Sequence, residues 1–563
     1  MLRDTEQQQT VTPWYIPRER FVREDRLTYA RRPAALLLTC VLLAALHTWP
    51  LVTAPHRYSR MDNADYQLNA WAISWVAHQL PRDPLHLFDA NMFWPEPRTL
   101  AFSEAMIVQG VMASPLIWMG ASPILAYNLV MLAGFVLTGF FFGMVARRWT
   151  GSWTAAYVTA SAAGFNAHLF TRLAHLQAMH DEFVAVVLLG MDLVFTRQRV
   201  RDALLLGVGF ALQGLTSIYL LTFTTWAAIF AAASRMATAA RGTRTRAVGL
   251  LTGAGVVAVL LLSFYLLAYV RLHEDRSFAR AAEDNQTFAG KYTDYLSTVS
   301  HAHYWWSKPF VDQSSSINFP GFTVLALVGA ALAHRATRRD ARVRMAVAVM
   351  VGCALASMVA RLPGYQYIHG WVPLFWAVRV QAHMGQVVLL AASLVAGYGA
   401  WRLRSHWGSR PAAWAVPIVL VVLINAEAFR APIPWREFTG IPPIYDTLAA
   451  IPRAVVVELP AFDRQAAFGN ARYLLHSTRH WHPMINGYSG FVPASYARAA
   501  EALQTFPGMQ ALEMLRARQV THVVIHEAPF VGMYGQAAFD RIGEIGSFQE
   551  VARDGEIRIY RFR

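Results

Sequence analysis

The chain has 563 residues, of which 55% are hydrophobic and 15% are charged. This apolar content exceeds the need of one globular core and excludes an ordinary soluble enzyme of several domains. The net charge of +15 does not indicate nucleic-acid binding, because the arginines cluster in short loops between apolar runs. Many of these runs have about 20 residues, the length that crosses a bilayer. The sequence therefore predicts a polytopic α-helical membrane protein.

Eleven membrane spans are predicted in chain order. They cover residues 34–53, about 122–146, 152–168, 178–196, 202–216, 218–234, 247–270, 320–334, 345–361, about 381–401 and 411–428. With the polar tail 1–33 in the cytoplasm, every arginine-rich loop falls on the cytoplasmic side, as the positive-inside rule requires. The two long outer loops, 54–121 and 271–318, lack this excess, and residues 54–104 hold four arginines against six acidic residues.

The stretch 104–119 leaves two alternatives open. It is apolar enough for a further span, but Ser103–Glu104 and Pro115 favour an outer helix beside the membrane. A span here would invert all later loops and place the arginine-rich ones outside. The topology with eleven spans, between a cytoplasmic N-terminus and an outer C-terminus, is therefore preferred.

From residue 431 the composition changes to that of a soluble domain, after a linker rich in proline. Two buried strands (454–460 and 520–527), helices within 495–518 and a hairpin over 548–562 are expected. We therefore predict a transmembrane domain over 34–430, followed by a small α/β domain over 431–563 on the outer side of the membrane.

Two aspartates directly follow the first span, in the stretch RYSRMDNADYQLNAWAISW (59–77). Asp62 is expected at or near the N-cap of a helix over 63–78, where a carboxylate accepts a backbone N–H. An apolar stripe predicts that this helix lies flat on the membrane surface; it consists of Leu68, Ala72, Trp75 and Val76, with Trp71 beside it. Capping and surface position leave Asp65 unexplained, although it lies close enough to the membrane surface to meet a lipid-carried head group.

Arg379 is predicted at the outer mouth of the span at 381–401, with His383 one helical turn later on the same face. A guanidinium group there can grip a phosphate with two hydrogen bonds. The alternative is an interfacial arginine that reaches for lipid head groups. These two residues are the candidate phosphate-binding pair.

The segment HLQAMHDE (175–182) is predicted to form a polar wall of a cavity, because polar groups at membrane depth usually face one. Its candidate residues are His175, Gln177, His180, Asp181 and Glu182. The spacing is not that of a known metal motif, so no metal ligand is assigned. A divalent metal as cofactor is left open.

Two further groups are candidate substrate contacts. In the loop 271–318, Trp305 and Lys308 suit a platform for a sugar or a lipid phosphate, or alternatively an interfacial aromatic belt. In the C-terminal domain, His480, Asn486 and Tyr488 suit acceptor recognition, or alternatively a structural turn at Asn486–Gly487.

An aspartate after the first span, a helix behind it, many spans and an outer C-terminal domain together resemble the GT-C superfamily of integral-membrane glycosyltransferases. The stretches 83–104, 373–386 and 472–491 are also similar to a group of bacterial GT-C-like proteins, many without an assigned substrate. The resemblance implies inverting transfer of a sugar from a polyprenyl-phosphate donor to an envelope glycan, lipid or protein. It also implies that an acidic residue of the first outer loop is the base. The acidic pair here reads DNAD instead of the compact DxD or ExD, so both Asp62 and Asp65 are candidates, and Asp65 is favoured.

Two other functions compete with a glycosyltransferase. A transporter or flippase for a lipid-linked glycan predicts inverted repeats and spans broken near the bilayer midplane. No such symmetry is visible in the sequence, and the candidate polar residues gather at the outer surface, which favours the enzyme. The third alternative is a non-catalytic assembly protein that binds a partner through residues 431–563.

Overall fold

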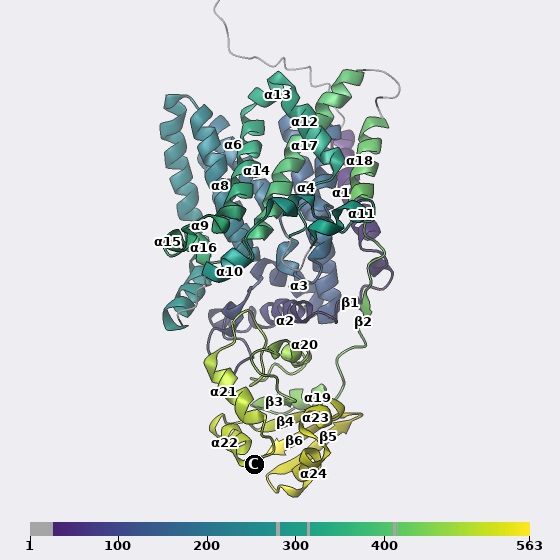
Figure 1. Cartoon of the computed structure of the whole chain (residues 1–563), viewed down its shortest axis with the longest axis vertical. Helices are drawn as coiled ribbons and strands as arrows, with labels where there is room; N and C mark the ends of the chain where they lie inside the picture. Colours follow the sequence, from purple (N-terminus) through teal and green to yellow (C-terminus); the bar gives the residue numbers. More distant parts are fainter. Residues whose placement is uncertain (1–25, 277–281, 312–315, 409–412, 414) are drawn as a thin grey trace, which may run out of the picture.

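The computed structural model describes residues 26–276, 282–311, 316–408, 413 and 415–563. Most of the predicted N-terminal tail lies outside the described residues. The described chain forms a long helical bundle, with a small domain containing a β-sheet at one end (Figure 1). The two parts are joined by helix α2 (Ala64–Gln79) and the loops around it.

Each predicted span coincides with a helix of the bundle. These helices are α1 (Arg26–His47), α4 (Pro123–Thr150), α5 (Trp153–Gly164), α6 (Glu182–Thr196), α7 (Val200–Thr216), α8 (Ile218–Thr238), α9 (Arg241–Arg276), α12 (Phe322–Ala333), α14 (Ala341–Met358), α17 (Gly385–Trp407) and α18 (Ala415–Ala428). Among the described residues, five segments are long and apolar enough to cross a membrane: Pro123–Thr150, Ile218–Thr238, Arg241–Glu274, Ala341–Arg361 and Gln381–Trp407. The chain is a multi-pass membrane protein, and the total of eleven crossings stays a prediction.

Helix α17 lies at the centre of the bundle, and all its residues from Gly385 to Ala400 are buried. Small residues allow the close packing. A Cβ atom on Gly399 would come within 2.0 Å of the carbonyl oxygen of Leu327 in α12, and one on Gly397 within 2.2 Å of Thr159 Oγ1 in α5. Such small residues let backbones approach where lipid supplies no hydrophobic driving force between helices.

Helix α2 is confirmed as a helix, but the prediction that it lies on the membrane surface is wrong. Every residue from Tyr66 to Ala77 is buried. Helices α3 (Ile107–Trp118) and α4 pack on it from the bundle, and α20 (Ala471–Ser477) packs on it from the C-terminal domain. The indole of Trp71 donates to Asn91 Oδ1 at 3.1 Å and that of Trp75 to the Leu87 carbonyl at 2.8 Å. The tryptophans therefore fasten α2 between two layers of protein.

Helix α3 occupies the stretch 104–119 that the sequence left ambiguous. Its 12 residues give a length of about 18 Å, well short of the ~30 Å hydrocarbon core. It packs against α2, α4 and α7. The stretch therefore forms a short helix packed on α2, α4 and α7.

Short helices connect the long ones. The α-helical pieces are α10 (Ala282–Thr287), α11 (Tyr304–Ser307), α13 (Arg335–Arg339), α15 (Tyr365–His369) and α16 (Pro373–Trp376). The 3₁₀ pieces are Leu51–Thr53, Pro84–His86, Thr99–Phe102, Leu169–Thr171, Leu176–Ala178, Tyr292–Leu296, Lys308–Phe310, Val359–Arg361, Gln381–Met384 and Ala467–Asn470. Helix α9 runs to Arg276, beyond the end predicted at residue 270.

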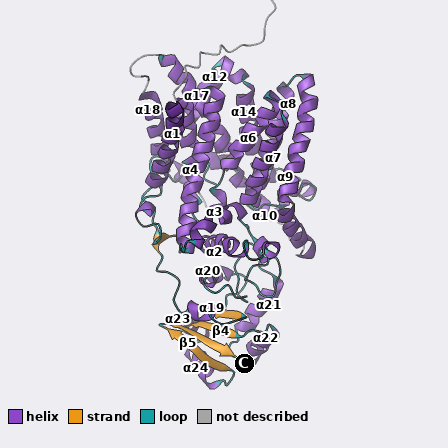
Figure 2. Ribbon diagram, turned by 180° about the vertical axis from the view of Figure 1, so that it is seen from behind, coloured by secondary structure: helices purple, strands orange, loops and turns teal. Residues whose placement is uncertain are grey.

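The C-terminal domain contains a four-stranded sheet in the order β3 (Val456–Leu459), β4 (His522–His526), β6 (Ile557–Phe562) and β5 (Phe548–Asp554). Strands β3 and β4 are parallel and fully buried, and the other pairs are antiparallel. The helices α19 (Tyr445–Ala449), α21 (Ala494–Leu503), α22 (Met509–Ala517), α23 (Glu527–Tyr534) and α24 (Gln536–Glu544) surround it (Figure 2). The four strands lie where the sequence placed two buried strands and a hairpin.

A two-stranded sheet fastens the linker of the C-terminal domain to the loop after α1. Strand β1 (Tyr58–Ser59) pairs antiparallel with β2 (Arg436–Glu437). The side chains of Arg57 and Glu437 form an ion pair beside it. The loop that leads into α2, and so to Asp65, is therefore held by the C-terminal half of the chain.

Candidate functional site

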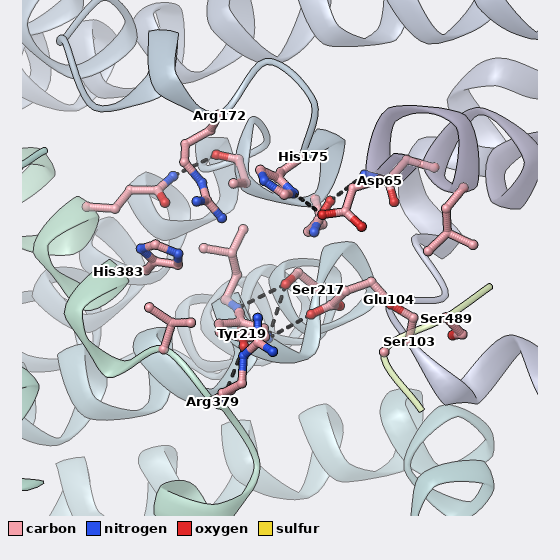
Figure 3. A pocket seen from close by; sticks show the side chains of 18 of the residues that line it. Asp65, Ser103, Glu104, Arg172, His175, Ser217, Tyr219, Arg379, His383 and Ser489 are labelled. Atoms are coloured by element: carbon pink, nitrogen blue, oxygen red, sulfur yellow. Dashed lines mark hydrogen bonds and ion pairs between the residues drawn. The ribbon is translucent and has the colours of Figure 1, made fainter. Parts of the chain in front are cut away.

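A cavity of about 530 Å³ lies where the bundle, α2 and the C-terminal domain meet. Its polar lining comes from six separate segments of the chain (Figure 3). These groups are Asp65 and Asn69 in α2; Ser103 and Glu104; Arg172, His175 and Gln177; Ser217 and Tyr219 at the start of α8; Arg379, His383 and Gln386; and Tyr488 with Ser489. The predicted candidates Asp65, Arg379, His383, His175, Gln177 and Tyr488 thus share one cavity.

Of the two candidate aspartates, only Asp65 reaches this cavity. The N-cap of α2 is Asn63, whose Oδ1 accepts the backbone N–H groups of Asp65 at 2.9 Å and Tyr66 at 3.3 Å. Asp62 therefore lies next to the N-cap, within the predicted range, but Asn63 provides the cap. Asp62 instead accepts two hydrogen bonds from Arg60, at 3.0 and 3.1 Å, which lower the pKa of its carboxyl group. Asp62 lines a different hollow.

The carboxylate of Asp65 is held from two sides. Tyr488 of the C-terminal domain donates a hydrogen bond to Oδ1 at 2.7 Å, and Nδ1 of His175 lies 3.6 Å from Oδ2. Burial and the charge of Asp65 raise the pKa of Tyr488, so its phenol stays protonated and can donate. Burial and the nearby Arg172 lower the pKa of His175 well below its usual value, so its ring is uncharged at neutral pH.

Two guanidinium groups reach the cavity from different elements. Arg172 lies between the 3₁₀ turns Leu169–Thr171 and Leu176–Ala178, and its buried Nε has no hydrogen-bond partner within the described part of the chain. Burial lowers the pKa of Arg172 to about 10, which still leaves it charged at neutral pH. Arg379 is exposed, and its guanidinium carbon lies 5.2 Å from the ring centre of Phe288. The backbone N–H of Arg379 donates to the hydroxyl of Tyr219 at 3.1 Å.

The predicted pairing of Arg379 and His383 on one helix face is wrong, although both residues line the cavity. Arg379 precedes the 3₁₀ helix Gln381–Met384, and α17 begins only at Gly385. His383 is held by a contact of 2.9 Å between its Nδ1 and the hydroxyl of Ser316. Figure 3 shows Asp65 on one side of the hollow and His383 on the other, with Arg172 and Arg379 on the walls between them.

Glu104 is a second carboxylate in the lining, but its oxygens have a structural task. They accept the backbone N–H groups of Ile218 at 2.8 Å and Tyr219 at 3.4 Å, at the first turn of α8. The hydroxyl of Ser217 caps the same turn. Glu104 therefore stabilises the N-terminus of α8. This leaves Asp65 as the carboxylate best placed for proton transfer.

Part of the predicted cavity wall lies elsewhere. His180, Asp181 and Glu182 are completely or almost completely buried and do not line the cavity. His180 Nδ1 lies 2.9 Å from Glu182 Oε1, and its Nε2 lies 3.1 Å from the Val130 carbonyl. Asp181 accepts a hydrogen bond from Gln386. The reason is that the chain enters α6 at Glu182, so these side chains pack among helices.

The aromatic platform and two of the acceptor candidates are also absent from the lining. Trp305 is 80% exposed, and neither it nor Lys308 lines the cavity. Asn486 is buried and bridges the backbone N–H and carbonyl of Glu458, at 2.7 and 2.9 Å. His480 is buried and accepts the backbone N–H of His482 at 3.0 Å. Asn486 and His480 hold the C-terminal domain together, and Tyr488 alone of the three faces the cavity.

Sequence reasoning missed Arg172, which is the cavity's most buried cation. The sequence did contain a signal for it, because arginines are depleted from short outer loops and Arg172 lies in a loop predicted to be an outer one. The contribution of Tyr219 and Glu104 had no local signal. Within the described ranges, no group of three or more His, Cys, Asp or Glu side chains is placed to hold a metal ion.

No protein-family model and no curated protein matches the sequence. Solved structures do match in fold. The oligosaccharyltransferase AglB from Archaeoglobus fulgidus, in complex with an inhibitory peptide and a dolichol-phosphate, is 12% identical; the match covers 94% of this chain and 74% of that chain, with a TM-score of 0.45. ArnT from Cupriavidus metallidurans, bound to undecaprenyl phosphate, is 13% identical; the match covers 94% of this chain and 97% of that one, with a TM-score of 0.48. At such scores the likeness provides no correspondence between individual residues.

Proposed function

We propose that this protein is a GT-C-type membrane glycosyltransferase, which moves a sugar from a polyprenyl-phosphate donor to a hydroxyl of an envelope glycan, lipid or protein. One observation carries the proposal. A single cavity at the end of the bundle brings together the carboxylate of Asp65 and the guanidinium groups of Arg172 and Arg379. Transfer from a lipid phosphate needs a base for the acceptor and cations for the leaving phosphate.

In the proposed reaction, Asp65 takes the proton of the acceptor hydroxyl. The acceptor oxygen forms a bond to the anomeric carbon of the donor sugar, while the bond from that carbon to the phosphate oxygen breaks. The bonding electron pair leaves with the polyprenyl phosphate. Because attack and departure occur on opposite faces of the sugar, the configuration at the anomeric carbon inverts.

Arg172 and Arg379 are assigned to the donor phosphate. A guanidinium group can donate two parallel hydrogen bonds to phosphate oxygens, and its charge stabilises the leaving group. The unpartnered Nε of Arg172 supports this role, because a buried donor without a partner is costly unless a ligand satisfies it. His383, on the wall opposite Asp65, is assigned to the same end of the cavity.

Tyr488 and His175 are assigned to the positioning of Asp65. The hydrogen bond from Tyr488 leaves Asp65 Oδ2 on the side of the uncharged His175. An uncharged ring does not neutralise the carboxylate. The two neighbours therefore fix the orientation of the Asp65 carboxylate.

The proposed location is the inner membrane of a bacterium, with the N-terminus in the cytoplasm and the C-terminal domain outside. The arginine-rich helix α13 lies at the end of the bundle opposite the C-terminal domain (Figure 1). The positive-inside rule assigns that end to the cytoplasm. The cavity would then open at the outer leaflet.

A substitution of Asp65 tests the function. Membranes that contain the full-length protein are supplied with undecaprenyl-phosphate-linked hexoses and pentoses, and the release of undecaprenyl phosphate is measured. We expect Asp65→Asn to lower turnover by at least about 100-fold, the usual contribution of a general base. Asp83→Asn is the matched control, because Asp83 is an exposed aspartate of the same loop outside the cavity. Near-normal turnover of Asp65→Asn at equal expression would remove Asp65 from the mechanism.

A further inference from the structure

A second cleft lies between the C-terminal domain and the loop after α1. It consists of two adjoining hollows of about 290 and 580 Å³, which share Met61, Arg472, His526 and Pro529 in their linings. The first turns of α2 separate this cleft from the catalytic cavity. Ala64 and Gln67 line the cleft, while Asp65, Leu68 and Asn69 line the cavity.

His526 is the most constrained polar group of the cleft. It ends strand β4, is 7% exposed, and its Nε2 lies 2.7 Å from Oε2 of Glu458, a fully buried residue of β3. Tyr445 donates to the same oxygen at 2.7 Å, and His476 Nδ1 lies 3.0 Å from the hydroxyl of Tyr445. Glu458 engages Nε2 of His526, so the other ring nitrogen, Nδ1, lies outside this pair. No residue in the described ranges hydrogen-bonds to this Nδ1.

Two other polar groups of the cleft also lack partners within the part of the chain that the structure describes. The guanidinium group of Arg472 is exposed on α20 and makes no hydrogen bond or ion pair there. Gln67 is 7% exposed; its amide nitrogen donates to the Met61 carbonyl at 2.9 Å, but its amide oxygen has no partner. Donors and acceptors of the cleft are thus available to a ligand.

Aromatic side chains provide apolar surface beside these polar groups. Phe468 is 60% exposed at the edge of the smaller hollow, and Phe462 and Tyr473 also line it. The ring of Phe462 packs directly on Gly469, where an added Cβ would lie 2.7 Å from the ring. Aromatic faces with a few fixed polar groups are typical of small-molecule sites, and they suit the C–H faces of sugar rings.

The charges of the cleft disfavour an ionic ligand. Four acidic residues line it against the single arginine Arg472; they are Asp62, Glu437, Asp554 and Glu556. A polyanion would therefore be repelled. Asp62 and Glu437 are already paired with Arg60 and Arg57, which weakens attraction for a cation. A neutral ligand rich in hydroxyl groups fits best, because each hydroxyl both donates and accepts.

We propose that this cleft binds a neutral saccharide chain, namely the glycan part of the acceptor, behind the wall that α2 forms. This inference rests on the proposed glycosyltransferase function and names the acceptor class for it. His526, Arg472 and Gln67 bind hydroxyl groups, and Phe468 stacks on a sugar ring. The acceptor would thus be held by the C-terminal domain at a distance from the reacting hydroxyl.

Isothermal titration calorimetry with the purified full-length protein tests the cleft. The probes are linear pentasaccharides of mannose, galactose, glucose and arabinose, and inorganic phosphate. We expect saturable binding of at least one pentasaccharide and none of phosphate. Phe468→Ala and Arg472→Met should each weaken that binding about fivefold to tenfold. The matched control is Met509→Ala, an exposed apolar residue of the same domain outside the cleft, which should bind as the wild type does.

In this design, a loss of saccharide binding can be distinguished from a loss of sugar transfer. Asp65→Asn should lose transfer and keep pentasaccharide binding, because Asp65 faces the other side of α2. Absence of saturable binding to all four pentasaccharides would overturn the cleft proposal, and so would binding that Phe468→Ala and Arg472→Met leave unchanged. Phosphate binding that depends on Arg472 would point to an anion site and overturn it as well. None of these results affects the role of Asp65.

Discussion

Tyr488 in the C-terminal domain donates a hydrogen bond of 2.7 Å to Asp65 at the start of α2, although 423 positions separate the two residues in the sequence. The cavity is therefore complete only when the C-terminal domain is docked on the helical bundle. The contact adds a tyrosine of the C-terminal domain to a cavity that is also lined by Arg172 and Arg379. It also makes the C-terminal domain part of the proposed catalytic machinery.

The first prediction concerns this hydrogen bond. Tyr488→Phe removes the donor and leaves the ring in place, so we expect kcat to fall about tenfold or more, as hydrogen bonds to charged groups are worth ~1.5–3 kcal/mol. The KM for the lipid-linked donor should change little, because Tyr488 acts on the base. Steady-state kinetics of the full-length protein measures both. Tyr534→Phe is the control, since Tyr534 lies outside the cavity; equal effects of the two substitutions would contradict the positioning role.

The second prediction concerns the arginines. Arg172→Gln and Arg379→Gln should each weaken binding of undecaprenyl phosphate about tenfold to 100-fold, because each loses charge-assisted hydrogen bonds. Microscale thermophoresis of the detergent-solubilised protein measures the change. The control Arg82→Gln removes an exposed arginine of the first outer loop, outside the cavity. Unchanged binding in both arginine variants would exclude the assigned phosphate site.

The third prediction concerns the dependence of stability on pH. Burial and Arg172 lower the pKa of His175 well below 6.5, so the folded state resists a proton that the unfolded state accepts. The contribution of uncharged His175 to the free energy of unfolding is therefore fully present above pH 6.5. It is lost as the pH falls below that value. The melting temperature should fall between pH 7 and pH 5, and it should fall less steeply in His175→Asn. A slope unchanged by this substitution would show that His175 does not titrate in this way.

The fourth prediction concerns the packing of α17 against α12. Gly399→Ala places a methyl group where the Leu327 carbonyl lies, so we expect a destabilisation of about 1–3 kcal/mol, as for other overpacked interiors. Thermal denaturation in detergent measures the shift. Gly329→Ala in α12 is the matched control, because a Cβ there meets no atom within 4 Å. It should leave stability unchanged or raise it; equal destabilisation by both would contradict the observed packing.

The helical bundle could be predicted from the sequence, because apolar runs and arginine-rich loops indicate bilayer crossing directly. The surroundings of helix α2 could not be predicted in this way. Its stripe of Leu68, Ala72, Trp75 and Val76 has the same pattern whether it meets lipid or protein. The partners of α2, Asn91 and α20, come from other parts of the chain. Periodicity shows that a helix has an apolar face, but it does not show what covers that face.

The site was predictable only in part, and for a similar reason. Asp65, Arg379 and His175 stood out because charged groups beside apolar spans are costly and rarely without a role. The N-cap moved from Asp62 to Asn63 because both residue types cap well and local preference does not separate them. His180 and Glu182 were misplaced because they pair with one another inside the bundle. Tyr488 was a candidate, but its contact with Asp65 depends on domain docking.

An experimental structure of the full-length protein with undecaprenyl phosphate tests the central claim most directly. We predict that the phosphate lies in the cavity beside Asp65, within hydrogen-bond reach of the guanidinium groups of Arg172 and Arg379. A phosphate bound outside this cavity, with Arg172 and Arg379 both turned away from it, would contradict the proposed transfer site.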